Sequence, residues 1–118
     1  MAGAIKGSTF LKGLAVEKNP HLKLTANYQK LLYALAKLPE TSAYRRHTES
    51  ITKERLHHVQ TTPNIEELEK KIDCGQVEEL IVQARNETML ARRMSVWKPW
   101  EPLAEPPPPN QWTWPPTK

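Results

Sequence analysis

The chain has one cysteine, Cys74, and no run of apolar residues long enough to cross a membrane. One thiol cannot form an intramolecular disulfide or a zinc site, which is typical of a protein in a reducing compartment. Glycine is also scarce, with four residues, and phenylalanine occurs once. Little material is left for strand-to-strand turns or for an aromatic core. These absences favour helices packed through Leu, Ile, Val and Ala.

Motifs for catalysis and for cofactor binding are missing from the sequence. There is no Gly-x-Gly-x-x-Gly, no phosphate-binding loop and no nucleophile elbow. His57 and His58 are adjacent, so on a helix their side chains point about 100° apart and cannot share a metal by themselves. His21 and His47 have no carboxylate or cysteine at a ligand spacing. We therefore predict no enzymatic activity, no metal, no cofactor and no small-molecule substrate.

The longest helical pattern runs from Gln76 to Lys98. Gly75 is suited to closing the preceding turn, and Pro99 cannot continue a helix. Six small or apolar residues recur at steps of three and four, which places them on one buried face. They are Val77, Leu80, Ile81, Ala84, Thr88 and Ala91. Earlier helices must cover this face. The adjacent Glu78–Glu79 pair is expected on the solvated side.

Three further helices are predicted before this one. The first spans Pro20–Leu38, with Asn19 as its cap and Pro39 as its stop. The second starts at Thr41 or Ser42 and runs to about Gln60, with Tyr44, Thr48 and Ile51 on one side. The third is short, is capped by Asn64, and ends at Gly75. Short connections predict antiparallel neighbours.

These elements predict an all-α protein. We expect a helical bundle over residues 19–98, preceded by an arm over residues 1–18 and followed by a tail over residues 99–118. The bundle is an up-down arrangement of three main helices with a short additional helix. The arm is extended, and the tail is extended and rich in Pro and Trp.

The N-terminal arm is open to three interpretations. It is poor in acidic residues and contains Ser, Thr and apolar residues, which resembles a mitochondrial targeting segment. It could equally lie on a partner protein. The third interpretation is a frayed terminus.

The C-terminal tail holds eight of the eleven prolines. Pro106–Pro109 favours polyproline II, which has no internal hydrogen bonds. A stiff strand loses little entropy when it docks, and each indole brings about 150–250 Å² of surface to bury. We therefore predict that four tryptophans contact the bundle or a partner. They are Trp97, Trp100, Trp112 and Trp114.

Positive charge is concentrated at the front of the chain. Residues 1–63 carry ten Lys or Arg against four Asp or Glu, a net charge of +6. A basic helical module that binds nucleic acid is one hypothesis, although the aromatic residues lie elsewhere, in the acidic tail. A solvated basic face is the simpler one. Arg92 and Arg93, near the end of the long helix, also complement the helix dipole.

Segments from residue 13 to residue 115 resemble one known family. The most specific are Trp-Lys-x-Trp-Glu-Pro-Leu from Trp97 and Gln-Trp-x-Trp-Pro from Gln111. The other matching pieces are Gly13–Val16, Asn19–His21, Ala43–Arg46, Thr48–Glu49, Ile51–Thr52, Gly75–Gln76, Glu78–Glu79, Leu90–Met94 and Pro106–Pro107. Together they resemble the 13-kDa accessory subunits, number five of the 1-alpha subcomplex, of mitochondrial respiratory complex I, NADH:ubiquinone oxidoreductase.

The resemblance implies a non-catalytic subunit that helps to assemble and stabilise the hydrophilic arm of complex I. It implies a peripheral position on the matrix side of the mitochondrial inner membrane. The implied partners are the 30-kDa core subunit of that arm and a nucleoside-kinase-like accessory subunit. Tyr44 and Arg45 join Arg92, Arg93 and the tryptophans as expected partner contacts, since all lie in matching pieces.

A second mitochondrial class offers an alternative. Leu-Tyr-Arg helical adaptors are also small and basic, and some are complex I subunits that hold an acyl carrier protein. The corresponding triplet here is Ala43-Tyr44-Arg45, and it lies in the second predicted helix instead of near the first.

Overall fold

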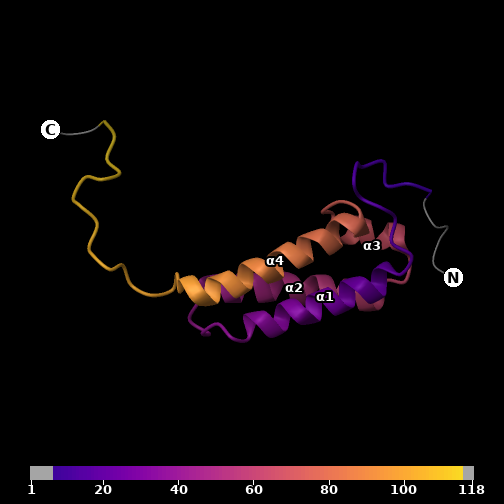
Figure 1. The fold of residues 1–118 in the computed structure, drawn as a ribbon, viewed down its shortest axis with the longest axis horizontal. Helices are drawn as coiled ribbons and strands as arrows, with labels where there is room; N and C mark the ends of the chain where they lie inside the picture. The colour runs from indigo at the N-terminus through magenta and orange to yellow at the C-terminus, as the bar shows by residue number, and fades with distance from the viewer. Residues whose placement is uncertain (1–6, 116–118) are drawn as a thin grey trace.

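The computed structural model describes residues 7–115, which form four α-helices and no strand. The helices are α1 (Pro20–Leu35), α2 (Ala43–Thr61), α3 (Ile65–Ile72) and α4 (Val77–Trp97), as Figure 1 shows. The prediction of an all-α protein is confirmed.

The first and last helices run in the same direction, and α2 runs against both. Leu24 near the start of α1 packs with Val77 at the start of α4, whereas Leu35 at the end of α1 packs with Ala91. Val59, late in α2, joins the first of these clusters, and Tyr44, early in α2, packs on the second. The three long helices therefore form an up-down-up arrangement, and α3 lies between α2 and α4 in the sequence (Figure 1).

The predicted buried face of α4 is confirmed. All six residues of the stripe are buried: Val77, Leu80, Ile81, Ala84, Thr88 and Ala91. The prediction for Glu78 was wrong, because its side chain is also buried, at 3% exposure. Glu78 lies in the first turn, where the positive end of the helix dipole favours a carboxylate.

The first two helices differ from expectation in detail. α1 ends at Leu35, not Leu38, because the chain tightens into turns in which the Leu38 N–H donates to the Leu35 carbonyl at 3.0 Å. The turns still bury Leu38. Within the described part, the Asn19 side chain makes no capping hydrogen bond, although Pro20 does begin the helix. On α2, Ile51 is 51% exposed.

The caps of α3 and α4 follow from particular side chains. Asn64 accepts hydrogen bonds from the N–H groups of Glu66 and Glu67, at 2.9 and 3.3 Å. α3 then ends in Asp73, whose φ is +55°, and not at Gly75 as predicted. Gly75, at φ +100°, instead turns the chain into α4. Lys98 ends α4 in the left-handed conformation just before Pro99.

The two termini leave the bundle at opposite ends (Figure 1). The described part of the N-terminal arm folds back in a turn in which the Thr9 hydroxyl donates to the Leu14 carbonyl at 2.5 Å. The Gln76 amide donates to the Thr9 carbonyl at 2.9 Å, which ties this turn to the start of α4. The tail runs away from the other end of α4.

Candidate functional site

The four tryptophans fall into two groups. Trp100 is half-buried and packs against the cluster formed by Leu31, Leu35, Leu38 and Ala91. Trp97, at the end of α4, is 59% exposed. Trp112 and Trp114 are 90% and 86% exposed on the part of the tail that lies beyond the bundle. Only Trp100 thus contributes to the packing at this end of the bundle, and the two outer indoles present their surface to solvent.

Arg92 and Arg93 are exposed on α4, one turn before its end. They are not in the last turn, so their contribution to the helix dipole is small. Arg92 lines a cavity of about 460 Å³ between α1 and α4, together with Lys30, Tyr33 and Lys37. The Lys37 ammonium lies 4.9 Å from the centre of the Tyr33 ring. This hollow is basic and contains no carboxylate.

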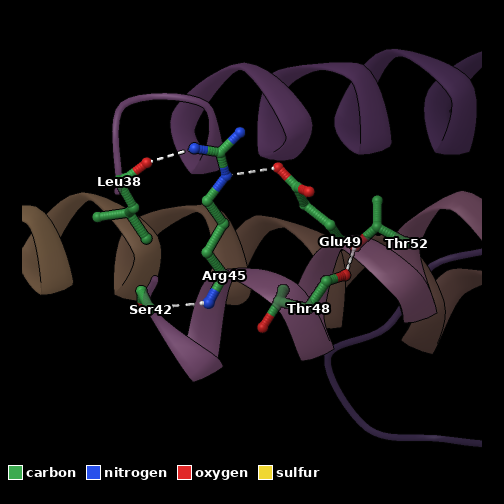
Figure 2. A network of polar contacts seen from close by, with 6 residues as sticks. All are labelled: Leu38, Ser42, Arg45, Thr48, Glu49 and Thr52. Carbon is green, nitrogen blue, oxygen red and sulfur yellow. Dashed lines mark hydrogen bonds and ion pairs between the residues drawn. The ribbon is translucent and has the colours of Figure 1, made fainter. Parts of the chain in front are cut away.

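Arg45 is used inside the chain. Its guanidinium donates to the Leu38 carbonyl at 2.5 Å and to the Glu49 carboxylate at 2.8 Å (Figure 2). Its backbone N–H donates to the hydroxyl of Ser42, the residue that caps α2, at 3.4 Å. One side chain therefore fastens the α1–α2 connection to the first turns of α2. The fork of donors in a guanidinium makes this double contact possible.

Tyr44 bridges α2 and α4. Its hydroxyl donates to the Glu87 carboxylate. Burial and then this hydrogen bond raise the pKa of the Tyr44 phenol above its ordinary value of 10.0. The phenol stays protonated and remains a donor at every physiological pH.

The structure gathers part of the predicted contact set at one end of the bundle. Tyr44 and Trp100 pack on the same cluster, and Trp97 lies at the end of the adjoining helix. Arg92 and Arg93 lie one turn back on that helix. Trp112 and Trp114 are exposed and belong to the tail, which runs away from the bundle (Figure 1).

Sequence reasoning missed a groove of about 400 Å³ between α2 and α4, with Tyr28 and Leu31 of α1 among its lining residues. Tyr28 looked like a core residue on a regular stripe, and its ring is indeed buried. Nothing in the spacing indicated that its hydroxyl would lie beside an open groove, because that depends on how three helices are placed. Among residues 7–115, no His, Cys, Asp and Glu side chains gather in a group of three that could hold a metal.

No helix in the described part of the chain is long and apolar enough to span a membrane. The family model described as "ETC complex I subunit conserved region" matches residues 13–79. NADH dehydrogenase (ubiquinone) 1 alpha subcomplex subunit 5 of Bos taurus is 50% identical over 115 residues, covering 98% of this chain and 99% of the relative. The protein of the same name from Rattus norvegicus is 51% identical with the same coverage.

The chain belongs to this family. The resemblance inferred from the tryptophan-rich segments and the matching pieces of the body is thereby confirmed. The protein of Caenorhabditis elegans named as the probable subunit 5 is 44% identical over 110 residues, 93% of this chain and 73% of the relative. The tail lies outside the residues that the family model matches, yet alignments that cover 98% of the chain include most of it. Trp112 and Trp114 therefore belong to a segment that subunit 5 proteins carry.

Proposed function

We propose that the chain is a non-catalytic accessory subunit of mitochondrial complex I that helps to assemble and stabilise the hydrophilic arm from its matrix side. In this role the bundle acts as a rigid body and the tail clamps a neighbouring subunit. Its full-length similarity to subunit 5 proteins supports membership of the complex. We propose the 30-kDa core subunit of the arm as the main neighbour and the nucleoside-kinase-like accessory subunit as a second one.

The observation that carries the clamp is the exposure of Trp112 and Trp114, at 90% and 86%. Two indoles on a Pro-rich strand that leaves the bundle offer large apolar surfaces and indole N–H donors. Aromatic anchors of this kind dominate the binding energy of many protein interfaces. Because proline limits the freedom of the strand, docking loses little conformational entropy.

The test is a double substitution, Trp112→Ala with Trp114→Ala, expressed in cells that lack the endogenous subunit. We expect the variant to fold normally and to be lost from complex I. The readout is mass spectrometry across a native gel, beside NADH-oxidising activity. Leu103→Ala, at a 74% exposed tail residue, is the matched control and should be retained more strongly.

Two results would count against this function. Normal incorporation of the double variant would remove the clamp. Migration of the unsubstituted chain as a small free species, away from the NADH-oxidising activity, would remove the accessory-subunit role altogether.

The two alternatives drawn from sequence have less support. The relatives named as subunit 5 align with 98% of this chain, which favours a subunit 5 protein over a Leu-Tyr-Arg adaptor. Tyr44 and Arg45, the residues of that triplet, make contacts within the chain. A nucleic-acid-binding module would bind nucleic acid with an affinity that falls steeply as the salt concentration rises. We expect this chain to show no saturable binding to nucleic acid at low salt.

A further inference from the structure

The groove between α2 and α4 has polar bridges on either side of it. On one side the Tyr44 hydroxyl donates to Glu87. On the other, the Arg55 guanidinium donates to the Gln83 amide oxygen at 3.4 Å. Thr48, Ile51 and Thr52 of α2 lie between the two bridges in sequence and line the opening, which holds about 400 Å³.

One polar group that lines this groove, the Tyr28 hydroxyl, has no acceptor for its proton. Tyr28 is 2% exposed, and its hydroxyl donates to no residue in the described part of the chain. Burial raises the pKa of the Tyr28 phenol, an effect that the Arg55 charge and a hydrogen bond from the Arg55 guanidinium partly offset, so the phenol stays neutral and keeps its proton. A buried donor without an acceptor is uncommon in folded proteins.

Arg55, beside Tyr28, is a cation that has only neutral acceptors. It donates to Gln83 and, at 3.2 Å, to the Cys74 sulfur. The ion pairs found within residues 7–115 are Arg45–Glu49 and Glu54–His58, and neither includes Arg55. Two donors, one of them charged, therefore lack a carboxylate acceptor within residues 7–115. The Glu87 carboxylate lies on the opposite side of the groove, where Tyr44 already binds it.

One apolar side chain, Ile51, lies at the otherwise polar opening of the groove. Ile51 projects from α2 with 51% of its surface exposed. An exposed isoleucine beside unused hydrogen-bond donors is the composition expected of a protein interface, where apolar contact surrounds a few polar groups.

We propose that the groove receives an acidic side chain from a neighbouring complex I subunit. Its carboxylate would accept hydrogen bonds from Arg55 and from the Tyr28 hydroxyl, and an adjacent apolar side chain would cover Ile51. The charge of Arg55 selects an acidic group. That group would lie at the Arg55–Gln83 end of the groove, because the Glu87 carboxylate beside Tyr44 would repel it from the other end. This docking site is separate from the tail and rests on the proposed function only in requiring that the chain assemble into complex I.

The experiment is a competition in cells that express the unsubstituted chain and one variant together. Mass spectrometry gives the ratio of the two chains in complex I, relative to their ratio in the free pool. We expect Tyr28→Phe and Arg55→Gln each to be under-represented about tenfold, the effect of losing a hydrogen bond to a charged group. Arg55→Lys keeps the charge and should recover part of the loss. Ile51→Glu should be excluded at least as strongly.

A control and a stability measurement separate docking from folding. Met89→Glu changes an α4 residue of similar exposure, 55%, that does not line the groove, and it should compete equally with the unsubstituted chain. Tyr28→Phe should leave the thermal unfolding temperature of the isolated full chain unchanged or raise it, because the buried hydroxyl donates to no acceptor within the described residues.

Three outcomes would overturn the proposal. Equal competition by Tyr28→Phe and Ile51→Glu would show that nothing docks in the groove. A lower unfolding temperature for Tyr28→Phe would assign the hydroxyl a partner within the chain. An Ile51-dependent dimer in sedimentation of the isolated chain would assign the groove to a second copy. Each result leaves the tail experiment and the accessory-subunit role standing, since those depend on Trp112 and Trp114.

Discussion

Tyr44 holds α2 to α4 through one hydrogen bond to a carboxylate. The two helices also share the Arg55–Gln83 contact, which at 3.4 Å is a weaker link. A half-buried hydrogen bond of this kind contributes about 1 kcal/mol to stability. The packing of α2 beside α4 is thus stabilised measurably by the hydroxyl of one residue, Tyr44.

Tyr44→Phe removes that hydroxyl and keeps the ring. We expect it to lower the free energy of unfolding by about 1 kcal/mol, because Glu87 loses a donor that water only partly replaces. Urea titration of the isolated chain at pH 7 measures the change. Tyr33→Phe is the control, since Tyr33 is 71% exposed and should have no effect.

The same phenol gives the protein a dependence on alkaline pH. The pKa of Tyr44 is raised above 10.0 in the folded chain, so the folded state keeps its proton at a pH where the unfolded state has lost it. The stabilisation is therefore complete below pH 10 and declines as pH rises above it. The gap between the unsubstituted chain and Tyr44→Phe should narrow between pH 10 and pH 11 in urea titrations. A constant gap over that range would contradict the assignment.

At the scale of elements, the start of α4 depends on close packing between a glycine and a glutamate. The Glu79 carboxylate accepts from the Gln76 N–H at 3.1 Å and so caps the helix. A Cβ on Gly75 would clash with the same Glu79 oxygen, and Gly75 also has φ +100°. The backbone conformation favours glycine here, and a larger residue would also displace the Glu79 carboxylate from its capping position.

Gly75→Ala should therefore destabilise the chain by about 2 kcal/mol, through backbone strain and displacement of the cap. Thermal unfolding followed by circular dichroism measures it. The Glu79→Ala variant separates the two causes, because it removes the side chain with which a Cβ at position 75 would clash. In that background Gly75→Ala should cost less, because the clash is gone and only the strain at φ +100° remains. Equal costs in both backgrounds would mean that the carboxylate moves aside freely.

The sequence predicted elements more fully than their junctions. The stripe from Val77 to Ala91 is regular over five turns, so the period alone identified the buried face. The end of α1 was placed at Leu38 because that leucine continues the apolar pattern and is indeed buried. The spacing of apolar residues does not show whether a buried residue belongs to the helix itself or to the turn that follows it.

The contact sites were the least predictable part, for a related reason. Arg45 and Tyr44 were identified by resemblance to a family, which does not say whether a side chain points inward or outward. The groove beside Tyr28 needs α1, α2 and α4 in their relative positions, and no local pattern contains that information. For Trp112 and Trp114 the sequence predicted contact with the bundle or with a partner. Both indoles are exposed, so contact with a partner stays a prediction.

At the scale of the whole molecule, the tail has an inner part whose Trp100 packs on the bundle and an outer part whose tryptophans are exposed. A chain that ends after Leu103 keeps the indole that packs on Leu35 and Leu38, and it should unfold at the temperature of the full chain. A chain that ends after Lys98 loses this apolar contact, which is worth about 1–3 kcal/mol. Its unfolding temperature should fall by several degrees. Identical temperatures for the two truncations, by circular dichroism, would show that Trp100 does not stabilise the bundle.

The parallel pairing of α1 and α4 has a consequence for the order in which the chain can fold. The centre of the core joins the first helix to the last, so its contacts are distant in sequence and slow to form. While the chain is being synthesised or threaded through a pore, α1 and α2 remain without the surface that covers them. A fragment that ends at Gln76 should show no cooperative thermal transition, whereas one that ends at Leu103 should. Incomplete chains are thus left open to proteases, and only a nearly complete polypeptide reaches the compact state.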